Sequence, residues 1–146
     1  MNKEFVMRGQ TASGETEILN FSGYKPGYAY RLVEFILYPS TNLLSQSVEM
    51  CGTITAGKTA IAPTDPSFLS AGLIGSVLMK NDNSQGNAGY QQSVVNDTFL
   101  ITQNLILMVQ DTFSTPVNWQ CRFVAEKMSG PEEAVANYKQ FTISDE

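Results

Sequence analysis

The most specific chemical signal in this sequence is a segment that fits the phosphate-binding loop of nucleotide-binding proteins. Residues 52–59 read Gly-Thr-Ile-Thr-Ala-Gly-Lys-Thr, which has the glycine, lysine and threonine spacing of that loop. Such a loop cradles phosphates only where a helix begins at its Lys-Thr pair, because the first helical amides hold the anion. Here Pro63 and Pro66 follow closely and exclude a useful helix. We therefore interpret the match as the end of a β-strand that runs into a loop.

Other catalytic arrangements are scarce, because the chain contains no histidine. This removes the most common general acid–base group and metal ligand, together with Ser-His-Asp and Cys-His nucleophiles. Glu34 and Glu49 lie on expected strands and could meet for glycoside chemistry, but an ion pair of Glu34 with Arg31 or Arg122 is the simpler interpretation. Residues 81–86 lack the acidic first ligand of a calcium loop, and Gln92 stands where such a loop has its bidentate glutamate. The sequence therefore predicts no enzyme, no catalytic residues, no cofactor and no metal site.

The composition indicates one globular domain with a weakly charged surface. The 146 residues are 42% hydrophobic and only 16% charged, and nine basic and fourteen acidic side chains give a net charge of −5. A chain of this length can form one self-sufficient core, so we expect a single domain over 1–146. A nucleic-acid-binding protein would show a basic cluster, and a membrane helix would need about 20 consecutive apolar residues. We therefore expect no direct contact with nucleic acid or a membrane, and no secretory signal.

Hydrophobic alternation predicts an all-β protein. Short β-rich runs with turn signals between them, about 8–12 residues apart, are typical of a β-sandwich or a jelly-roll-like fold with about eight to nine strands. Residues 57–72 and 81–89 are expected to be loops. One short C-terminal helix is expected over Glu132–Gln140, where proline and carboxylates stand at the start. Terminal arms are expected at about 1–13 and 129–146. In the second arm, residues 141–146 are expected to be extended after the helix. The expected strands are 4–9, 15–21, 28–38, 46–56, 73–79, 94–102, 104–110 and 117–128.

The same alternation predicts which side chains face the core. Between Val117 and Ala125 every second residue is apolar, so Trp119 and Cys121 are expected to be buried. Cys51 is expected on the polar face of its own strand. A disulfide between the two cysteines is therefore not expected, and two reduced thiols indicate folding in a reducing compartment.

Aromatic residues outside the expected core are candidates for contacts with partners. Tyr28, Tyr30 and Tyr38 share strand parity with core residues and are expected to pack inside. Loop tyrosines could instead form stacking platforms for a sugar. The aromatic residues of the loops and of the two expected arms make up the candidate partner interface: Phe5, Tyr24, Tyr90, Tyr138 and Phe141.

Three segments of this β-rich, weakly charged chain stand out by their residue order: Phe5-Val6-Met7-Arg8-Gly9, Tyr28-Ala29-Tyr30-Arg31-Leu32-Val33-Glu34-Phe35 and Ser129-Gly130-Pro131-Glu132-Glu133. In this overall style the sequence resembles the small β-sandwich virion structural proteins of bacteriophages, in particular those that decorate or cement tailed-phage capsids. The resemblance implies a non-enzymatic homo-oligomer, made in the host bacterial cytoplasm, that binds the major capsid protein or other virion proteins on the capsid surface. Two alternatives stay open: another virion role, as a small jelly-roll coat subunit or a spike or fibre component, and a carbohydrate-binding β-sandwich module.

Overall fold

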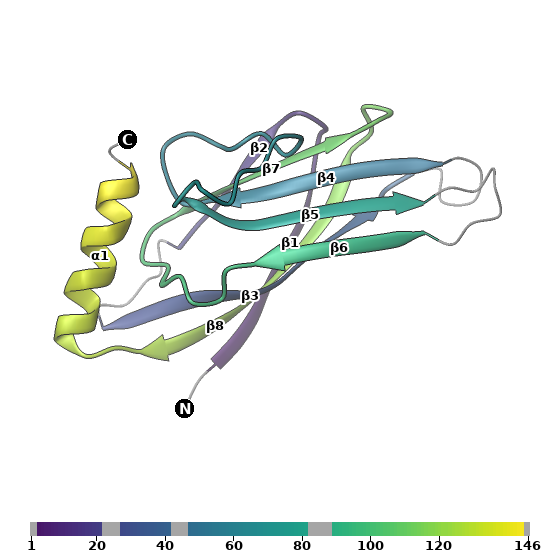
Figure 1. The fold of residues 1–146 in the computed structure, drawn as a ribbon. Helices are drawn as coiled ribbons and strands as arrows, with labels where there is room; N and C mark the ends of the chain where they lie inside the picture. Colours follow the sequence, from purple (N-terminus) through teal and green to yellow (C-terminus); the bar gives the residue numbers. More distant parts are fainter. Residues whose placement is uncertain (1–2, 22–26, 42–46, 82–88, 145–146) are drawn as a thin grey trace.

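The expected all-β sandwich with one short C-terminal helix is confirmed. A computed structural model describes residues 3–21, 27–41, 47–81 and 89–144. Within these residues two antiparallel sheets pack face to face, and helix α1 (Gly130–Ser144) lies across one end of them (Figure 1).

The sheets bring together strands that are far apart in the sequence. The three-stranded sheet has the order β1 (Lys3–Thr11), β8 (Val117–Lys127) and β3 (Tyr28–Pro39). The five-stranded sheet has the order β2 (Thr16–Leu19), β7 (Leu105–Asp111), β4 (Val48–Thr55), β5 (Leu73–Asn81) and β6 (Tyr90–Val95). The last strand of the chain is therefore the centre of the smaller sheet.

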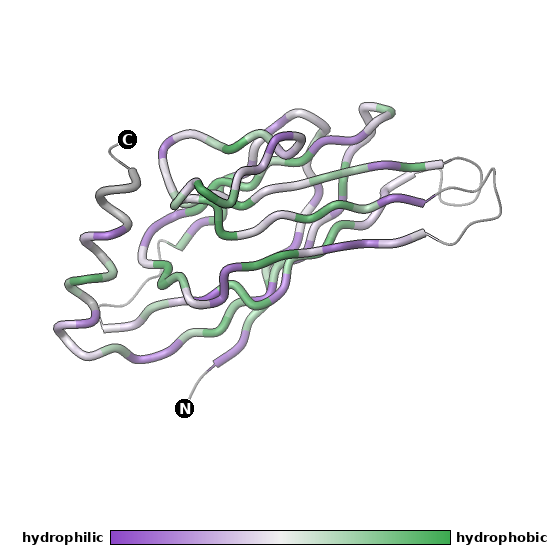
Figure 2. Tube along the Cα trace, viewed as in Figure 1, coloured by the Kyte–Doolittle hydropathy of each residue, from purple (hydrophilic) through white to green (hydrophobic). Residues whose placement is uncertain are grey.

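A hydrophobic core fills the space between the two sheets. Trp119, Cys121 and Phe123 of β8 face it, as the alternation predicts, and none of them is more than 7% exposed. Ile54 and Leu107 face it from the five-stranded sheet and are fully buried. In Figure 2, hydrophobic stretches recur along the strands of both layers. Each large apolar side chain buried in this way contributes about 1.5–3 kcal/mol to the free energy of folding.

Trp119 fits closely against β1. Its indole Nε1 donates a 2.9 Å hydrogen bond to the hydroxyl of Thr11, which satisfies the polar group of a buried ring. Gly9 pairs with Trp119 in the strand register, and a Cβ atom at Gly9 would lie 2.8 Å from Cζ2 of the ring. The strand can lie this close to the indole because residue 9 has no side chain.

The strand expected over 4–9 is confirmed as β1, but the N-terminal segment is part of the sheet and not the expected arm. Lys3–Thr11 pairs with β8 along its whole length, and Phe5 stacks on Phe123 with ring centroids 5.4 Å apart. Phe5 and Met7 share the face that packs against the core. The physical reason is that a short run with one apolar face gains more from burial in a sheet than from exposure as an arm.

β3 changes face in its middle. Its register with β8 shifts after Leu32, so Val33 is an extra residue and the alternation inverts beyond this bulge. Leu32 faces the core before the bulge and Phe35 faces it afterwards. Tyr38, which was expected inside, is therefore outside and 60% exposed, whereas Tyr30 still packs against the core. Tyr28, also expected inside, is 38% exposed at the start of the strand.

Side chains of β6 close one side of the sandwich against the edge of β3. The Gln91 amide accepts a 2.9 Å hydrogen bond from the backbone N–H of Leu37 and donates a 3.1 Å bond to its carbonyl oxygen. The hydroxyl of Ser93 donates a 2.6 Å bond to the carbonyl oxygen of Phe35. These bonds occupy edge groups of β3 that would otherwise be open to another strand.

β6 lies earlier in the chain than the strand predicted over 94–102. It ends before Asn96, whose backbone N–H donates to the carbonyl oxygen of Ile74 at 2.8 Å. The Asn96 side chain accepts hydrogen bonds from the backbone and hydroxyl of Thr98, which favours a turn over a continuing strand. Ile101 then forms a single bridge to β3.

Helix α1 is longer than predicted. Ser129 and Glu132 form a capping box at its start: the serine hydroxyl accepts the Glu132 backbone N–H at 3.3 Å, and the Glu132 carboxylate accepts the Ser129 backbone N–H at 3.4 Å. The helix continues to Ser144, so the extended tail expected from residue 141 is helical over 141–144. Among the helix side chains that the structure describes, Ala136 is buried, against a small cluster that includes Met128.

Candidate partner interface

The outer face of the five-stranded sheet carries a row of uncharged side chains. Cys51 of β4 pairs with Leu78 of β5 on one side and with Gln110 of β7 on the other. Leu78 in turn pairs with Gln92 of the edge strand β6. Residues paired in this way lie side by side on one face of a sheet, so the row runs across four strands.

A loop beside this row presents two large apolar side chains to solvent. Phe68 is 72% exposed and Leu69 is 97% exposed. Hydrogen bonds fix the backbone around them: Ser67 accepts the N–H of Leu69 through its hydroxyl and the N–H of Ser70 through its carbonyl oxygen, at 3.3 and 3.0 Å. The loop therefore holds both side chains outward in one conformation.

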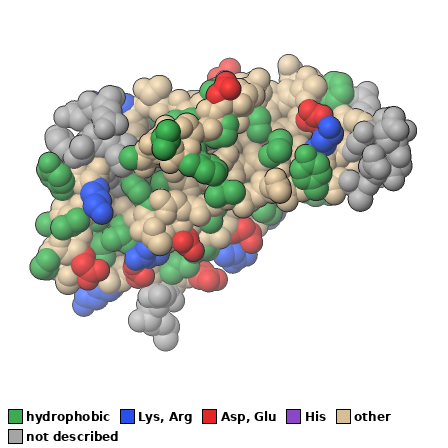
Figure 3. All heavy atoms as spheres, in the orientation of Figure 1, with side chains coloured by type: hydrophobic (Ala, Val, Ile, Leu, Met, Phe, Trp, Pro, Cys, Tyr) green, Lys and Arg blue, Asp and Glu red, His purple; other side chains and the backbone are tan. Residues whose placement is uncertain are grey.

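The loop and the edge strand form one continuous surface. Phe68 and Val94 of β6 line a common hollow of about 300 Å³. Val94 is 53% exposed and Leu78 is 44% exposed. We call these residues the sheet-and-loop surface: Phe68, Leu69, Leu78, Tyr90 and Val94. In Figure 3, hydrophobic and neutral side chains cover the middle of this side of the molecule, and charged groups gather mainly along its lower margin.

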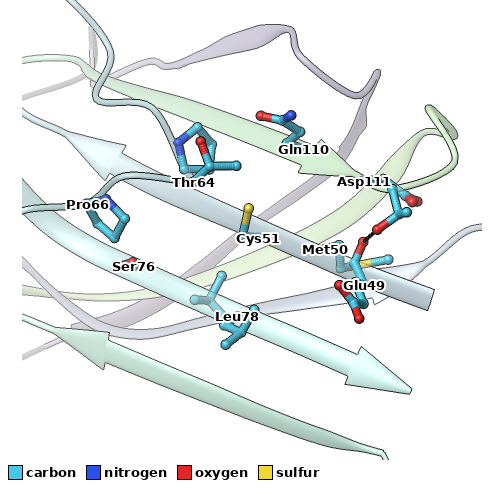
Figure 4. Close-up of a pocket in the computed structure, with 12 residues that line it drawn as sticks. Glu49, Met50, Cys51, Thr64, Pro66, Ser76, Leu78, Gln110 and Asp111 are labelled. Carbon is cyan, nitrogen blue, oxygen red and sulfur yellow. Dashed lines mark hydrogen bonds between the residues drawn. The ribbon is translucent and has the colours of Figure 1, made fainter. Parts of the chain in front are cut away.

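A second hollow, of about 420 Å³, opens over the uncharged row. Figure 4 shows Cys51 between Thr64 and Pro66 of the loop on one side and Glu49 and Asp111 on the other. Leu78 lines this hollow and belongs to the sheet-and-loop surface, so the two are neighbours.

The reactive groups at this hollow are already engaged or suppressed. Burial raises the pKa of the Cys51 thiol, which disfavours the nucleophilic thiolate. Glu49 forms a 3.1 Å ion pair with Lys80. Asp111 accepts hydrogen bonds from the N–H of Phe113 and the hydroxyl of Thr115, so it stabilises its own turn. Glu49 and Asp111 therefore each already have a structural partner at this hollow.

The proposed meeting of Glu34 and Glu49 is wrong. Glu34 lies on β3 and Glu49 on β4, which belong to different sheets. Beyond the bulge Glu34 alternates with the core residue Phe35, and Glu49 alternates with the core residue Met50. The two carboxylates therefore face away from each other on opposite sides of the sandwich.

The alternative ion pairs of Glu34 are also corrected. Arg31 pairs with Glu126 at 2.7 Å, and Arg122 pairs with Glu4 at 3.8 Å. The carboxylate that pairs with Arg122 is Glu4 of the N-terminal strand. We had expected this segment in a terminal arm, so its position beside β8 was not predicted.

The segment that fits the phosphate-binding loop is the end of a strand and a loop, as interpreted from the sequence. Its first half belongs to β4, and residues 57–72, all of which the structure describes, contain no helix. The hydroxyl of Thr53 donates to the carbonyl oxygen of Ile61 at 2.6 Å, and the hydroxyl of Thr55 accepts the Ile61 N–H at 3.2 Å. These bonds fold the loop back onto the outer face of β4, which buries both threonines.

The predicted interface residues do not form one surface. Tyr90 is 51% exposed on β6 and belongs to the sheet-and-loop surface, whereas Tyr138 is 71% exposed on α1, and β6 begins at the end of the molecule away from α1 (Figure 1). Phe5 packs against the core. Tyr24 and the side chain of Phe141 lie outside the described residues.

Phe68 and Leu69 were missed by sequence reasoning, although a signal was available. Both stand in a stretch that proline and small residues already marked as an exposed loop. Two adjacent large apolar residues in such a loop are exposed unless something covers them, and exposed apolar groups that gather together mark interaction sites.

A separate hollow of about 520 Å³ lies on the outer face of the three-stranded sheet. Tyr38 lies beside Asn118 in the strand register, and Asn118 accepts a 2.9 Å hydrogen bond from the Gln10 side chain. Gln120 and Arg8 complete its polar rim. This surface combines an exposed ring with amide groups.

Among the described residues, no group of three or more Cys, Asp or Glu side chains is placed to hold a metal ion. No helix in the described part of the chain has the length and apolar character to cross a membrane. Comparisons with protein-family models, curated proteins and solved structures found no match to this chain. Its function is therefore inferred from the side chains and their arrangement.

Proposed function

We propose that this chain is a non-enzymatic structural protein of a phage virion: a decoration or cement protein that binds and stabilises the coat-protein lattice on the capsid surface. The observation that carries the proposal is the hydrogen-bonded loop that holds Phe68 and Leu69 exposed beside an uncharged sheet face. The resemblance of the sequence to such proteins supplies the class of partner.

The character of this surface supports a protein partner. Interface cores are depleted in charge and enriched in aromatic and apolar side chains. The nearby ionic groups Lys80 and Glu49 are paired with each other, so docking need not strip water from an unpaired charge. Cys51 lies protonated in the row and offers no competing reaction.

The two loop side chains set the scale of the binding energy. Full burial of a phenylalanine or leucine side chain contributes about 1.5–3 kcal/mol. Because Phe68 and Leu69 start 72% and 97% exposed, a partner that covers both gains about 3–5 kcal/mol. This corresponds to a factor of at least about 100 in Kd.

The test is co-sedimentation of the protein with emptied phage heads that lack their decoration protein. A Phe68→Ser/Leu69→Ser double variant should bind about 100-fold more weakly, at low and high salt alike, because apolar burial is insensitive to charge screening. A matched control is Val135→Ser/Tyr138→Ser, which removes exposed apolar side chains of α1, 54% and 71% exposed.

The control variant should bind like the wild type, and both variants should keep the wild-type thermal midpoint, since exposed side chains contribute little to folding. Loop variants that bind as well as the wild type, or complete release of the wild type by moderate salt, would refute docking through this surface. Large self-assembled shells in light scattering would instead indicate a coat subunit.

One observation favours a carbohydrate-binding module as a second candidate. Tyr38 is 60% exposed beside Asn118 and Gln120, in the hollow on the three-stranded sheet, and an aromatic ring with amide groups can stack on a sugar and bind its hydroxyls. Binding on a glycan array that is lost in Tyr38→Ala but kept in Tyr138→Ala would support this function over the first.

A further inference from the structure

Within the described residues, β1 is the longest edge strand after β3 and has no further strand beside it. The two sheets end in four edge strands, β1, β3, β2 and β6. The edge of β3 is occupied by the side chains of Gln91 and Ser93 and by the bridge to Ile101. β2 has four residues and β6 has six, whereas β1 has nine. Among the residues that the structure describes, β8 is the one strand paired with β1.

This edge lacks most of the features that usually prevent one strand from pairing with another. Natural proteins protect edges with proline, bulges, short strands or charged side chains, and of these β1 has only charges, at Lys3, Glu4 and Arg8. Residues 3–11 contain no proline, and their register with β8 is unbroken. A regular edge of this length offers a row of backbone hydrogen-bonding groups to a further strand.

We propose that β1 pairs antiparallel with β1 of a second copy of this chain, around a two-fold axis at Val6. The two three-stranded sheets then form one six-stranded sheet. The inference is independent of what the sheet-and-loop surface binds, because that surface lies on the other sheet.

Charge complementarity selects the register. Glu4, Val6 and Arg8 alternate with the core-facing residues of β1, and Glu4 also forms a 3.8 Å ion pair with Arg122 of its own chain. With the axis at Val6, Glu4 of each copy lies opposite Arg8 of the other, so two opposite-charge pairs form. An axis at Glu4 or at Arg8 would set like charges against each other, and an axis at Phe5 or Met7 would pair neither charge with its opposite.

The apolar residues of β1 fit the same register. Val6 is 41% exposed on the outer face and would contact its own copy across the axis. On the inner face Phe5 and Met7 are only partly buried at the margin of the core. Phe5 of one copy lies opposite Met7 of the other in this register, so pairing would join the margins of the two cores.

Charge exchange tests this register. Sedimentation velocity and light scattering over a range of concentrations should show a dimer for the wild type. Glu4→Arg alone and Arg8→Glu alone each place like charges opposite one another twice, and each should raise the dimer Kd at least about tenfold. The double variant Glu4→Arg/Arg8→Glu restores opposite charges and should restore the dimer. Glu17→Arg, an exposed change on β2, should leave it unchanged.

Cross-linking tests the position of the axis independently. Opposed Cα atoms in an antiparallel pair are about 4.5–5.5 Å apart, which permits a disulfide. Val6→Cys should therefore form a cross-linked dimer under mild oxidation. Arg8→Cys should not, because residue 8 lies about 13 Å from its own copy in this register, and the wild type controls for Cys51 and Cys121.

The proposal is overturned by a wild type that stays monomeric at all concentrations, or by a dimer that either single charge variant leaves intact. It is also overturned if the Val6→Cys and Arg8→Cys variants cross-link equally. Circular dichroism of each variant shows whether it keeps the native fold, so loss of the dimer is separated from loss of structure.

Discussion

Replacing Gly9 by alanine tests how closely β1 is fitted to the core. The new Cβ atom would lie 2.8 Å from Cζ2 of Trp119 and 3.2 Å from Cε2. Non-bonded carbon atoms pack at about 3.5–4.0 Å, so the ring or the strand must move by more than about half an ångström. The ring is held by its 2.9 Å hydrogen bond to Thr11 and by the core around it, so it cannot turn away freely.

Two effects of this substitution oppose each other. Alanine is favoured over glycine inside a strand by about 0.5–1 kcal/mol, because glycine loses more backbone entropy on folding. Overpacking a dense core costs about 1–3 kcal/mol. The steric effect is the larger, so Gly9→Ala should lower the free energy of unfolding by about 1–2 kcal/mol.

Urea unfolding followed by circular dichroism measures this change, and the fluorescence of the single tryptophan reports any movement of the ring. Gly130→Ala is the control, because nothing lies within 4 Å of a Cβ atom there. In the Gly9→Ala background, Trp119→Phe should cost less than it does in the wild type, since the smaller ring leaves room for the methyl group. A Gly9→Ala variant as stable as the wild type, with unchanged emission, would refute the close fit.

Three further outcomes are expected. Lys58→Ala should leave the free energy of unfolding unchanged. Calorimetric titration of the wild type with ATP and magnesium should show no heat of binding, because no helix follows this lysine. Micromolar ATP binding that is lost in Lys58→Ala would contradict the interpretation of this segment as a strand end and a loop. Burial raises the pKa of the Cys51 and Cys121 thiols above the ordinary value of 9.0. As the pH rises, the unfolded chain therefore loses these protons before the folded chain does. The free energy of unfolding, measured in urea at a series of pH values, should fall above about pH 9. Below that pH a thiol reagent should label Cys51 slowly and Cys121 only after denaturation, and fast labelling of both would argue against their burial. Ser129→Ala should destabilise α1 by about 1 kcal/mol, seen as faster amide exchange in the helix with β8 unaffected; equal protection in both proteins would show that the capping contact with Glu132 contributes nothing.

Strand alternation was sufficient to predict most of the sandwich. Of the described strands, all but β6 lie within two residues of their expected bounds, because each is a β-rich run of strand length between turn signals. The reversal in β3 could not be predicted in this way. Val33 is apolar, and both faces of that segment carry apolar residues, so one additional residue leaves no visible break in the pattern. The exposure of Tyr38 follows from that break alone.

Long-range contacts account for the other differences. The pattern over residues 4–9 predicted a strand, but its partner begins more than a hundred residues later, and the hydrogen bond between Thr11 and Trp119 spans 108 positions. Local periodicity carries no information about such a pairing. Likewise Phe68 and Leu69 are visible in the sequence, but local patterns do not show that the loop before them is bonded to β4 through Ile61.

The central place of β8 has a consequence for folding during synthesis. Both neighbours of β8, at residues 3–11 and 28–39, are made long before residues 117–127. At about 5–20 residues per second, β1 waits roughly 5–20 s for the strand that completes its sheet. Such non-local pairing also makes for slow folding. The smaller sheet therefore assembles only after residues 117–127 have been made, and a chain that stops before residue 117 keeps two apolar strands without the partner that they share.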